Sequence, residues 1–156
     1  LSMNISGLLS PSAVKVITGA SSKKRLIQDI AEMASSCYGL HAGRTADALQ
    51  ERESLGPTGV GKGIALPHAR IDKLPNVVGL FLRLERPMDY DSVDRLPVDL
   101  VFALLAPQDA GVDHLKALAL VSRTLRDPSI CQKLRSNADP VTLHAVLTET
   151  QAIQAA

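Results

Sequence analysis

The sequence predicts an α/β domain built as a three-layer sandwich, in which helices cover both faces of a mixed β-sheet. Residues 98–105 are almost wholly apolar, which is typical of a strand buried on both of its faces. Segments with helical spacing come before and after the strand-like middle of the chain, an order that places a sheet between helical layers. The 156 residues suffice for one such unit, and we expect a single domain over residues 3–156.

Two helices are predicted ahead of the sheet, after an apolar stretch at residues 14–17 that is compatible with a strand. Ser21 or Ser22 can cap the first helix, and apolar side chains then recur at helical spacing until Gly39 supplies a C-terminal stop. The second helix is predicted over about residues 42–54, and its charged end leads into a glycine-rich segment.

Three apolar segments are predicted to be strands, at residues 64–66, 77–84 and 98–105, with an aspartate-rich turn joining the last two. Three helices then close the chain. The first of them is expected to turn one apolar face inward: Val112, Leu115, Leu118, Ala119 and Leu125.

The last two helices share a start signal. Asp127-Pro128 and Asp139-Pro140 each place a capping carboxylate before a proline suited to the first turn. Both signals predict a helix that begins at the proline.

Composition and charge exclude several classes of function. Aromatic residues make up only 3% of the chain and tryptophan is absent, which argues against a protein that stacks the bases of single strands. The 17 basic and 16 acidic side chains provide no general affinity for a phosphate backbone. We therefore expect no nucleic-acid partner.

The chain also carries the signs of a cytoplasmic protein. Its apolar runs are far shorter than the ~20 residues of a transmembrane helix, so no membrane insertion is expected. No signal peptide is visible; we expect Met3 to be the native start and Leu1 and Ser2 to be added residues. Cys37 and Cys131 lie in apolar helical patterns and are interpreted as reduced core thiols.

The glycine-rich segment from Gly56 to Lys62 is close to a phosphate-binding P-loop but departs from it in two ways. Gly63 stands where the hydroxyl that binds Mg²⁺ is required, and an apolar strand follows where a helix should begin. These departures disfavour a nucleotide-binding module. The alternating Gly59, Gly61 and Gly63 still allow two interpretations, a loop with N–H groups turned to an anion or a flexible connection.

His68 is the sharpest candidate for chemistry. Pro67 stiffens the chain at the end of the predicted strand, so the histidine is expected to leave that strand on a rigid support. A neutral imidazole is a competent nucleophile, and at pH 7 an unperturbed histidine is mostly neutral. Four nearby cations could hold a phosphoryl group: Arg52, Lys62, Arg70 and Lys73.

His114 strengthens this hypothesis because it lies at the start of a predicted helix, where free N–H groups favour an anion. If that start faces the end of the strand at residues 64–66, two imidazoles flank one pocket. A metal-dependent hydrolase built on His68, His114 and Asp113 is the competing interpretation, but it lacks a further ligand at suitable spacing. No metal and no cofactor are expected.

Several separated segments resemble one known family in the right order. The segment GVGKGIALPH at residues 59–68 is similar to the active-site signature of the fructose/mannitol-type EIIA domains of the bacterial phosphoenolpyruvate:sugar phosphotransferase system. The resemblance continues through PVDLVFALL at 97–105, HLKAL at 114–118 and ERE at 51–53. The start, MNIS at 3–6, and the stand-alone architecture resemble the nitrogen-regulatory branch.

This resemblance implies a phosphohistidine relay. His68 would accept a phosphoryl group, on Nε2, from an HPr-like phosphocarrier, and Arg52 and His114 match family positions that stabilise the transferred charge. Lys62 occupies a variable position of the signature and receives no role. The partners implied are the carrier and regulated target proteins, among which transporters and kinases are candidates. The alternative is an EIIA component that passes phosphate to a sugar-specific EIIB during fructose or mannitol uptake.

Overall fold

The computed structural model describes residues 3–155, with side-chain surroundings through Glu149. The expectation about Leu1 and Ser2 lies outside the described residues. The elements follow in the order α1 (Ile5–Leu8), β1 (Leu9–Ile17), α2 (Lys23–Tyr38), α3 (Ala42–Ser54), β2 (Gly59–Gly61), β3 (Ile64–Ala65), β4 (His68–Ile71), β5 (Val78–Met88), β6 (Val98–Pro107), α4 (Val112–Leu125), α5 (Pro128–Arg135) and α6 (Pro140–Ala155).

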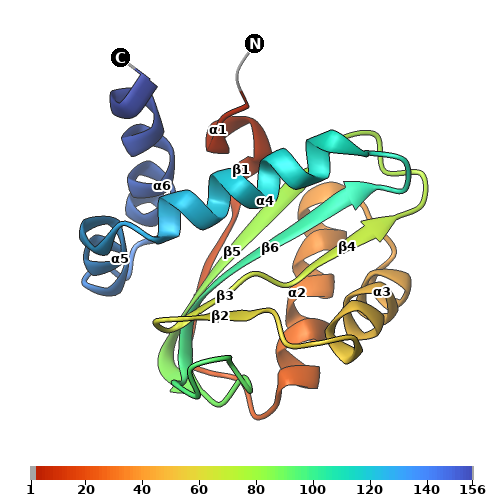
Figure 1. Ribbon diagram of the computed structural model, residues 1–156, viewed down its shortest axis with the longest axis horizontal. Helices are drawn as coiled ribbons and strands as arrows, with labels where there is room; N and C mark the ends of the chain where they lie inside the picture. Colours follow the sequence, from red (N-terminus) through yellow and green to blue (C-terminus); the bar gives the residue numbers. More distant parts are fainter. Residues whose placement is uncertain (1–2, 156) are drawn as a thin grey trace.

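The described strands form one mixed sheet in the order β1-β5-β6-β3-β2, and β4 also pairs with β6. β5 is antiparallel to β6 and parallel to β1, whereas β3 and β4 both run parallel to β6. Helices α2 and α3 lie on one face of this sheet and α4 crosses the other, as Figure 1 shows. The predicted sandwich with a mixed sheet is confirmed.

β6 lies at the centre of the sheet and of the core. Its residues from Leu100 to Ala106 are all fully buried, as the apolar run predicts. The two phenylalanines of the chain, Phe81 on β5 and Phe102 on β6, pack in neighbouring strands with ring centroids 6.2 Å apart. Apart from Tyr90, which is also fully buried, most of the remaining core is aliphatic, which follows from the small number of aromatic residues.

The predicted helix boundaries are confirmed where caps define them. Ser22 Oγ accepts from the backbone N–H of Arg25 at the start of α2, and Gly39 ends that helix with φ of 70°. Asp127 accepts from the N–H of Ser129 at the start of α5. Sequence reasoning missed α1, the first half of β1, β2 and β4, which are short or lack clear periodicity.

The glycine-rich segment forms a β-hairpin, and neither interpretation of its glycines is correct. β2 and β3 are joined by Lys62 and Gly63, whose φ values of 57° and 81° give the left-handed pair that a tight two-residue hairpin needs. The N–H of Lys62 donates to Asp94 Oδ2 at 2.8 Å rather than facing an open anion site. A Cβ on Gly59 would collide with Ser92 Oγ, so close approach explains that glycine.

The strand predicted at residues 64–66 ends earlier than expected and then resumes. Ile64 pairs with Leu100 and His68 with Leu104, so β3 and β4 follow the same register along β6. Pro67 interrupts them because it has no N–H to donate, although its carbonyl still accepts from the N–H of Leu104. His68 therefore begins a strand, whereas the sequence interpretation had it leaving one.

The predicted inward face of α4 is correct in part. Leu125 is buried and Leu118 packs against the core, but Ala119 is exposed and Val112 and Leu115 are 61% and 66% exposed. The apolar spacing misplaced part of the face because two of the buried positions, His114 and Thr124, hold polar residues. The helix therefore turns His114 toward the interior and leaves Leu115 on the surface.

Two further expectations concern the cysteines and membranes. Cys131 is buried, but Cys37 is only half-buried, so the interpretation of both as core thiols holds for Cys131 alone. Within residues 3–155, no helix combines the length and apolar character needed to cross a bilayer.

Candidate functional site

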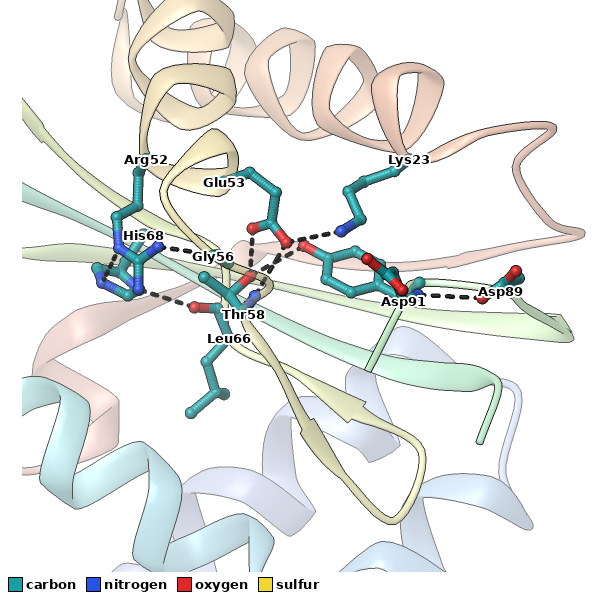
Figure 2. Close-up of polar contacts among 10 residues, drawn as sticks. Lys23, Arg52, Glu53, Gly56, Thr58, Leu66, His68, Asp89 and Asp91 are labelled. Atoms are coloured by element: carbon teal, nitrogen blue, oxygen red, sulfur yellow. Dashed lines mark hydrogen bonds and ion pairs between the residues drawn. The ribbon is translucent and has the colours of Figure 1, made fainter. Parts of the chain in front are cut away.

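His68 is held at both ring nitrogens. Its Nδ1 lies 2.9 Å from the carbonyl oxygen of Leu66, and its Nε2 lies 3.2 Å from Nε of Arg52 (Figure 2). A carbonyl oxygen only accepts and the Arg52 Nε–H only donates, so both contacts require the same tautomer. Nδ1 carries the proton, and the lone pair of Nε2 is directed at the guanidinium.

Arg52 reaches this position from the last turn of α3. Its Nη1 donates to the carbonyl oxygen of Gly56 at 3.0 Å, in the loop that follows the helix. Contacts at Nε and Nη1 together orient the plane of the guanidinium against the imidazole of His68. A cation at a helix C-terminus is favoured by the helix dipole, so the location suits this side chain.

His114 approaches His68 from the opposite side, in the first turn of α4. The two ring centroids are 5.5 Å apart and the planes meet at 70°. His114 is buried, and its Nε2 has no hydrogen-bond partner within the described residues. A buried ring nitrogen without a partner is unfavourable in a folded protein unless something binds there, so this atom marks the pair of histidines as a binding position.

Both imidazoles are neutral near pH 7. Burial lowers the pKa of His68 below its usual 6.5, and the neighbouring Arg52 guanidinium lowers it further, while the Leu66 carbonyl opposes the shift. Burial likewise lowers the pKa of His114, with additional contributions from His68 and Arg70. A neutral ring with a free electron pair is the form in which histidine acts as a nucleophile.

A buried polar network lies next to Arg52, and sequence reasoning missed it. Glu53 accepts from the Thr58 N–H at 2.9 Å, from the Thr58 hydroxyl at 2.6 Å, and from Lys23 Nζ at 2.9 Å (Figure 2). The hydroxyls of Thr58 and Tyr90 are 3.1 Å apart, and burial raises the pKa of Tyr90 far above its usual value. The only sequence signal was the ERE segment itself, since Lys23 and Tyr90 are 30 or more residues away from Glu53.

The other predicted cations do not gather at His68. Lys62 lies in the hairpin turn before Ile64, and Ile64 itself is four residues of strand, or roughly 13 Å, from His68 along β6. Arg70 is engaged with the carbonyl oxygen of Gln108, and Lys73 lies in the turn after β4. Of these four cations, only Arg52 forms a hydrogen bond with His68 among the described residues.

The competing metal site receives no support from the described residues. No group of three or more histidine, cysteine, aspartate or glutamate side chains there could hold a metal ion. Asp113, the carboxylate closest in sequence to His114, is exposed in the first turn of α4.

Three exposed apolar side chains lie near the site residues along the chain. Leu55 is three residues beyond Arg52, and Val112 and Leu115 are close to His114 in the sequence. A groove of about 1240 Å³ lies elsewhere, between α1, the segment at residues 74–78 and another side of α4. His68, His114 and Arg52 do not line that groove, although Asp113 does. His68 is half-buried and His114 is buried, so the pair is only partly open to solvent.

Comparison with known proteins gives a consistent assignment. Residues 7–150 match the family model described as phosphoenolpyruvate-dependent sugar phosphotransferase system, EIIA 2. A nitrogen regulatory protein from Bradyrhizobium diazoefficiens is 46% identical over 145 residues, which cover 93% of this chain and 95% of the relative. The nitrogen regulatory protein of Escherichia coli K12 is 36% identical over 150 residues, covering 96% of this chain and 92% of that protein.

A solved structure agrees with these relatives. The crystal structure of nitrogen regulatory protein IIA-Ntr from Neisseria meningitidis superposes with a TM-score of 0.84 at 31% identity, covering 91% of this chain and 97% of that one. Fold, signature segment and similarity thus extend over nearly the same residues. The chain belongs to the EIIA 2 family of the phosphoenolpyruvate-dependent sugar phosphotransferase system.

Proposed function

We propose that residues 3–156 form one phosphoryl-acceptor domain, a phosphohistidine relay of the nitrogen-regulatory branch. His68 accepts a phosphoryl group from an HPr-like phosphocarrier, and partner proteins respond to whether it is phosphorylated. The observation that carries this proposal is the arrangement around one atom. Nε2 of His68 has its lone pair free of a proton, a guanidinium 3.2 Å away and a second imidazole beside it.

The transfer needs only one bond to form and one to break. The lone pair of His68 Nε2 attacks phosphorus, and the electron pair of the broken P–N bond returns to the carrier's imidazole. The His68 ring gains positive charge, which the Leu66 carbonyl oxygen stabilises through the proton on Nδ1. Placement and charge stabilisation supply most of the catalysis in such a step.

Arg52 and His114 act on the transferred group. The Arg52 Nε–H occupies the Nε2 lone pair before transfer, so it must move from the ring nitrogen to a phosphoryl oxygen as the new bond forms. The unpartnered Nε2 of His114 is the second group that can bind a phosphoryl oxygen, if it carries a proton. Both contacts strengthen as negative charge gathers at His68, which is the requirement for catalysis.

The exposed apolar residues support a protein as the phosphoryl donor. Leu55, Val112 and Leu115 are exposed and lie close in sequence to Arg52 and His114, and such side chains offer the kind of surface on which a carrier docks. The relatives named nitrogen regulatory protein align over almost the whole chain, which favours the regulatory branch over sugar uptake. Targets such as transporters or kinases belong to this proposal as partners.

The experiment is phosphorylation with phosphoenolpyruvate, Enzyme I and the HPr-like carrier. Wild type should gain one acid-labile phosphate, and His68→Ala should gain none. His41→Asn is the matched control, because His41 is exposed and asparagine preserves the acceptor that caps α3. His114→Ala should still accept phosphate, but more slowly. Labelling of His68→Ala at the wild-type level would refute the assignment of the acceptor.

A second experiment separates regulation from transport. Pulldown with wild type, His68→Ala and His68→Asp should yield partners that distinguish among the three forms if phosphorylation is the signal. Rapid onward transfer from phosphorylated chain to a sugar-specific EIIB would instead support the uptake alternative.

A further inference from the structure

The carboxylate of Glu53 is the most buried charged group near the site, and the relay chemistry does not use it. Its side chain is 5% exposed, yet it accepts three hydrogen bonds, one from Lys23 and two from Thr58. Lys23 Nζ also lies 4.4 Å from the centroid of the Tyr90 ring. The carboxylate thus joins the start of α2, the end of α3 and the loop that leads into β2.

These contacts bear directly on Arg52. Glu53 and Arg52 are neighbours at the end of α3, and each is bonded to the same short loop, Arg52 to the Gly56 carbonyl and Glu53 to Thr58. Hydrogen bonds from the end of α3 therefore hold the loop at two positions, Gly56 and Thr58. If the hydrogen bonds to Thr58 are lost, the Gly56 carbonyl, which accepts from the Arg52 guanidinium and orients it, is free to move (Figure 2).

We propose that Glu53 is a positioning residue for phosphoryl transfer, which acts by holding the loop at residues 55–58 so that Arg52 stays on Nε2 of His68. This inference rests on the proposed function. Glu53 contacts neither His68 nor the transferred group. Its charge raises the pKa of His68 only as the smallest of four causes, so the positioning effect passes through Thr58 and Gly56. Small displacements of a positioning group are costly, since about 1 Å can reduce a rate by roughly 100-fold.

Three variants separate positioning from simple stabilisation. Glu53→Ala removes all three hydrogen bonds. Glu53→Gln keeps them, because its carbonyl can accept from Lys23 and the Thr58 N–H while its amide donates to the Thr58 hydroxyl. Glu51→Ala is the matched control on the same helix, where the side chain is exposed. Thr58→Val replaces Glu53→Ala in the experiment if Glu53→Ala does not fold. It removes the hydrogen bond from the Thr58 hydroxyl to Glu53 Oε2 and keeps the side-chain volume nearly unchanged.

Two measurements are made on each folded variant: the initial rate of phosphorylation by the HPr-like carrier, and the NMR signal of the Arg52 Nε–H. We expect Glu53→Ala to lower the rate about 10- to 100-fold while still reaching one phosphate per chain. Its Arg52 Nε–H signal should be lost to exchange with solvent. Thr58→Val should show the same two changes to a smaller extent, and Glu53→Gln and Glu51→Ala should retain rate and signal.

A folded Glu53→Ala with wild-type rate would overturn the inference, as would a reduced rate with an unchanged Arg52 signal. The NMR arm also stands without phosphorylation. If wild type accepted no phosphate, the proposed function would fail, while loss of the Arg52 signal in Glu53→Ala would still establish that Glu53 positions Arg52.

Discussion

Replacement of Arg52 by glutamine tests the charge that the site places beside His68. Arg52→Gln removes the guanidinium that lies 3.2 Å from Nε2 and leaves a side chain that is polar and shorter. Two consequences are expected, a slower transfer of the phosphoryl group and a higher pKa of His68. Arg44→Gln is the control, because Arg44 is an exposed arginine on the same helix.

The size of the rate effect follows from the geometry. Two unit charges about 4 Å apart near a protein surface interact by about 4 kcal/mol, which is the upper limit for the contribution of Arg52. Only the part of this energy that grows during transfer affects the rate. Removal of one charge-stabilising donor typically slows a reaction about 10²–10³-fold, equivalent to about 2.7–4 kcal/mol, which is compatible with that limit.

The direction of the pKa effect follows from its causes. Arg52 lowers the pKa of His68, so its removal should raise that pKa toward 6.5, although burial, the larger cause, still keeps it below that value. The rate of phosphoryl acceptance declines as His68 becomes protonated. The midpoint of the rate profile should therefore shift to higher pH in Arg52→Gln.

The assay measures the initial rate of phosphorylation by the HPr-like carrier between pH 5 and 8, together with an NMR titration of the His68 ring. A wild-type rate in Arg52→Gln would refute the role of Arg52 in charge stabilisation. A His68 pKa that stays constant or falls would show that the hydrogen bond seen at Nε2 does not persist in solution.

Two further predictions concern stability. Because the pKa values of His68 and His114 in the folded protein lie below 6.5, the unfolded chain binds more protons in mild acid, and the free energy of unfolding should fall as pH drops below about 6.5. In chemical denaturation, the His68→Gln/His114→Gln double variant should show a weaker dependence of this free energy on pH than wild type. The same dependence in both proteins would contradict the prediction. Gly63→Ala should destabilise the protein more than Gly39→Ala in thermal unfolding. Both glycines have positive φ, which costs a residue with a Cβ about 1–2 kcal/mol, but a Cβ at position 63 would also lie 2.6 Å from Arg135 Nη2, whereas one at position 39 would meet nothing within 4 Å. Equal losses of stability would show that Arg135 moves away from the new Cβ without a cost in free energy.

Much of the fold could be predicted because its signals are local. Ser22 and Gly39 define α2 through groups within five residues of them in the chain, and the aspartate before Pro128 does the same for α5. The apolar run of β6 predicts burial on both faces without knowledge of its neighbours. The failures were elements whose signals are weak, such as β2, with only three residues, two of them glycine.

The candidate site could also be predicted only in part. Residue types and their order were enough to identify the motif around His68 and the family positions of Arg52 and His114. The orientation of α4 about its own axis could not be predicted, because Thr124 and His114 are polar and the apolar pattern assigned Leu115 to the buried face. That orientation depends on how the helix packs on the sheet.

By itself, the sequence determined the sandwich architecture and most helix ends, and it singled out His68 as the candidate acceptor, since each depends on nearby residues or on a linear motif. Only the tertiary structure decided which nitrogen of His68 carries no proton, that the His114 ring lies beside it, and that Glu53 joins a buried network next to Arg52. These contacts connect side chains of α3, β4, α4 and the segment around Tyr90. Side chains so far apart in the chain come together only when the helices pack against the sheet, so no local sequence pattern predicts the contacts.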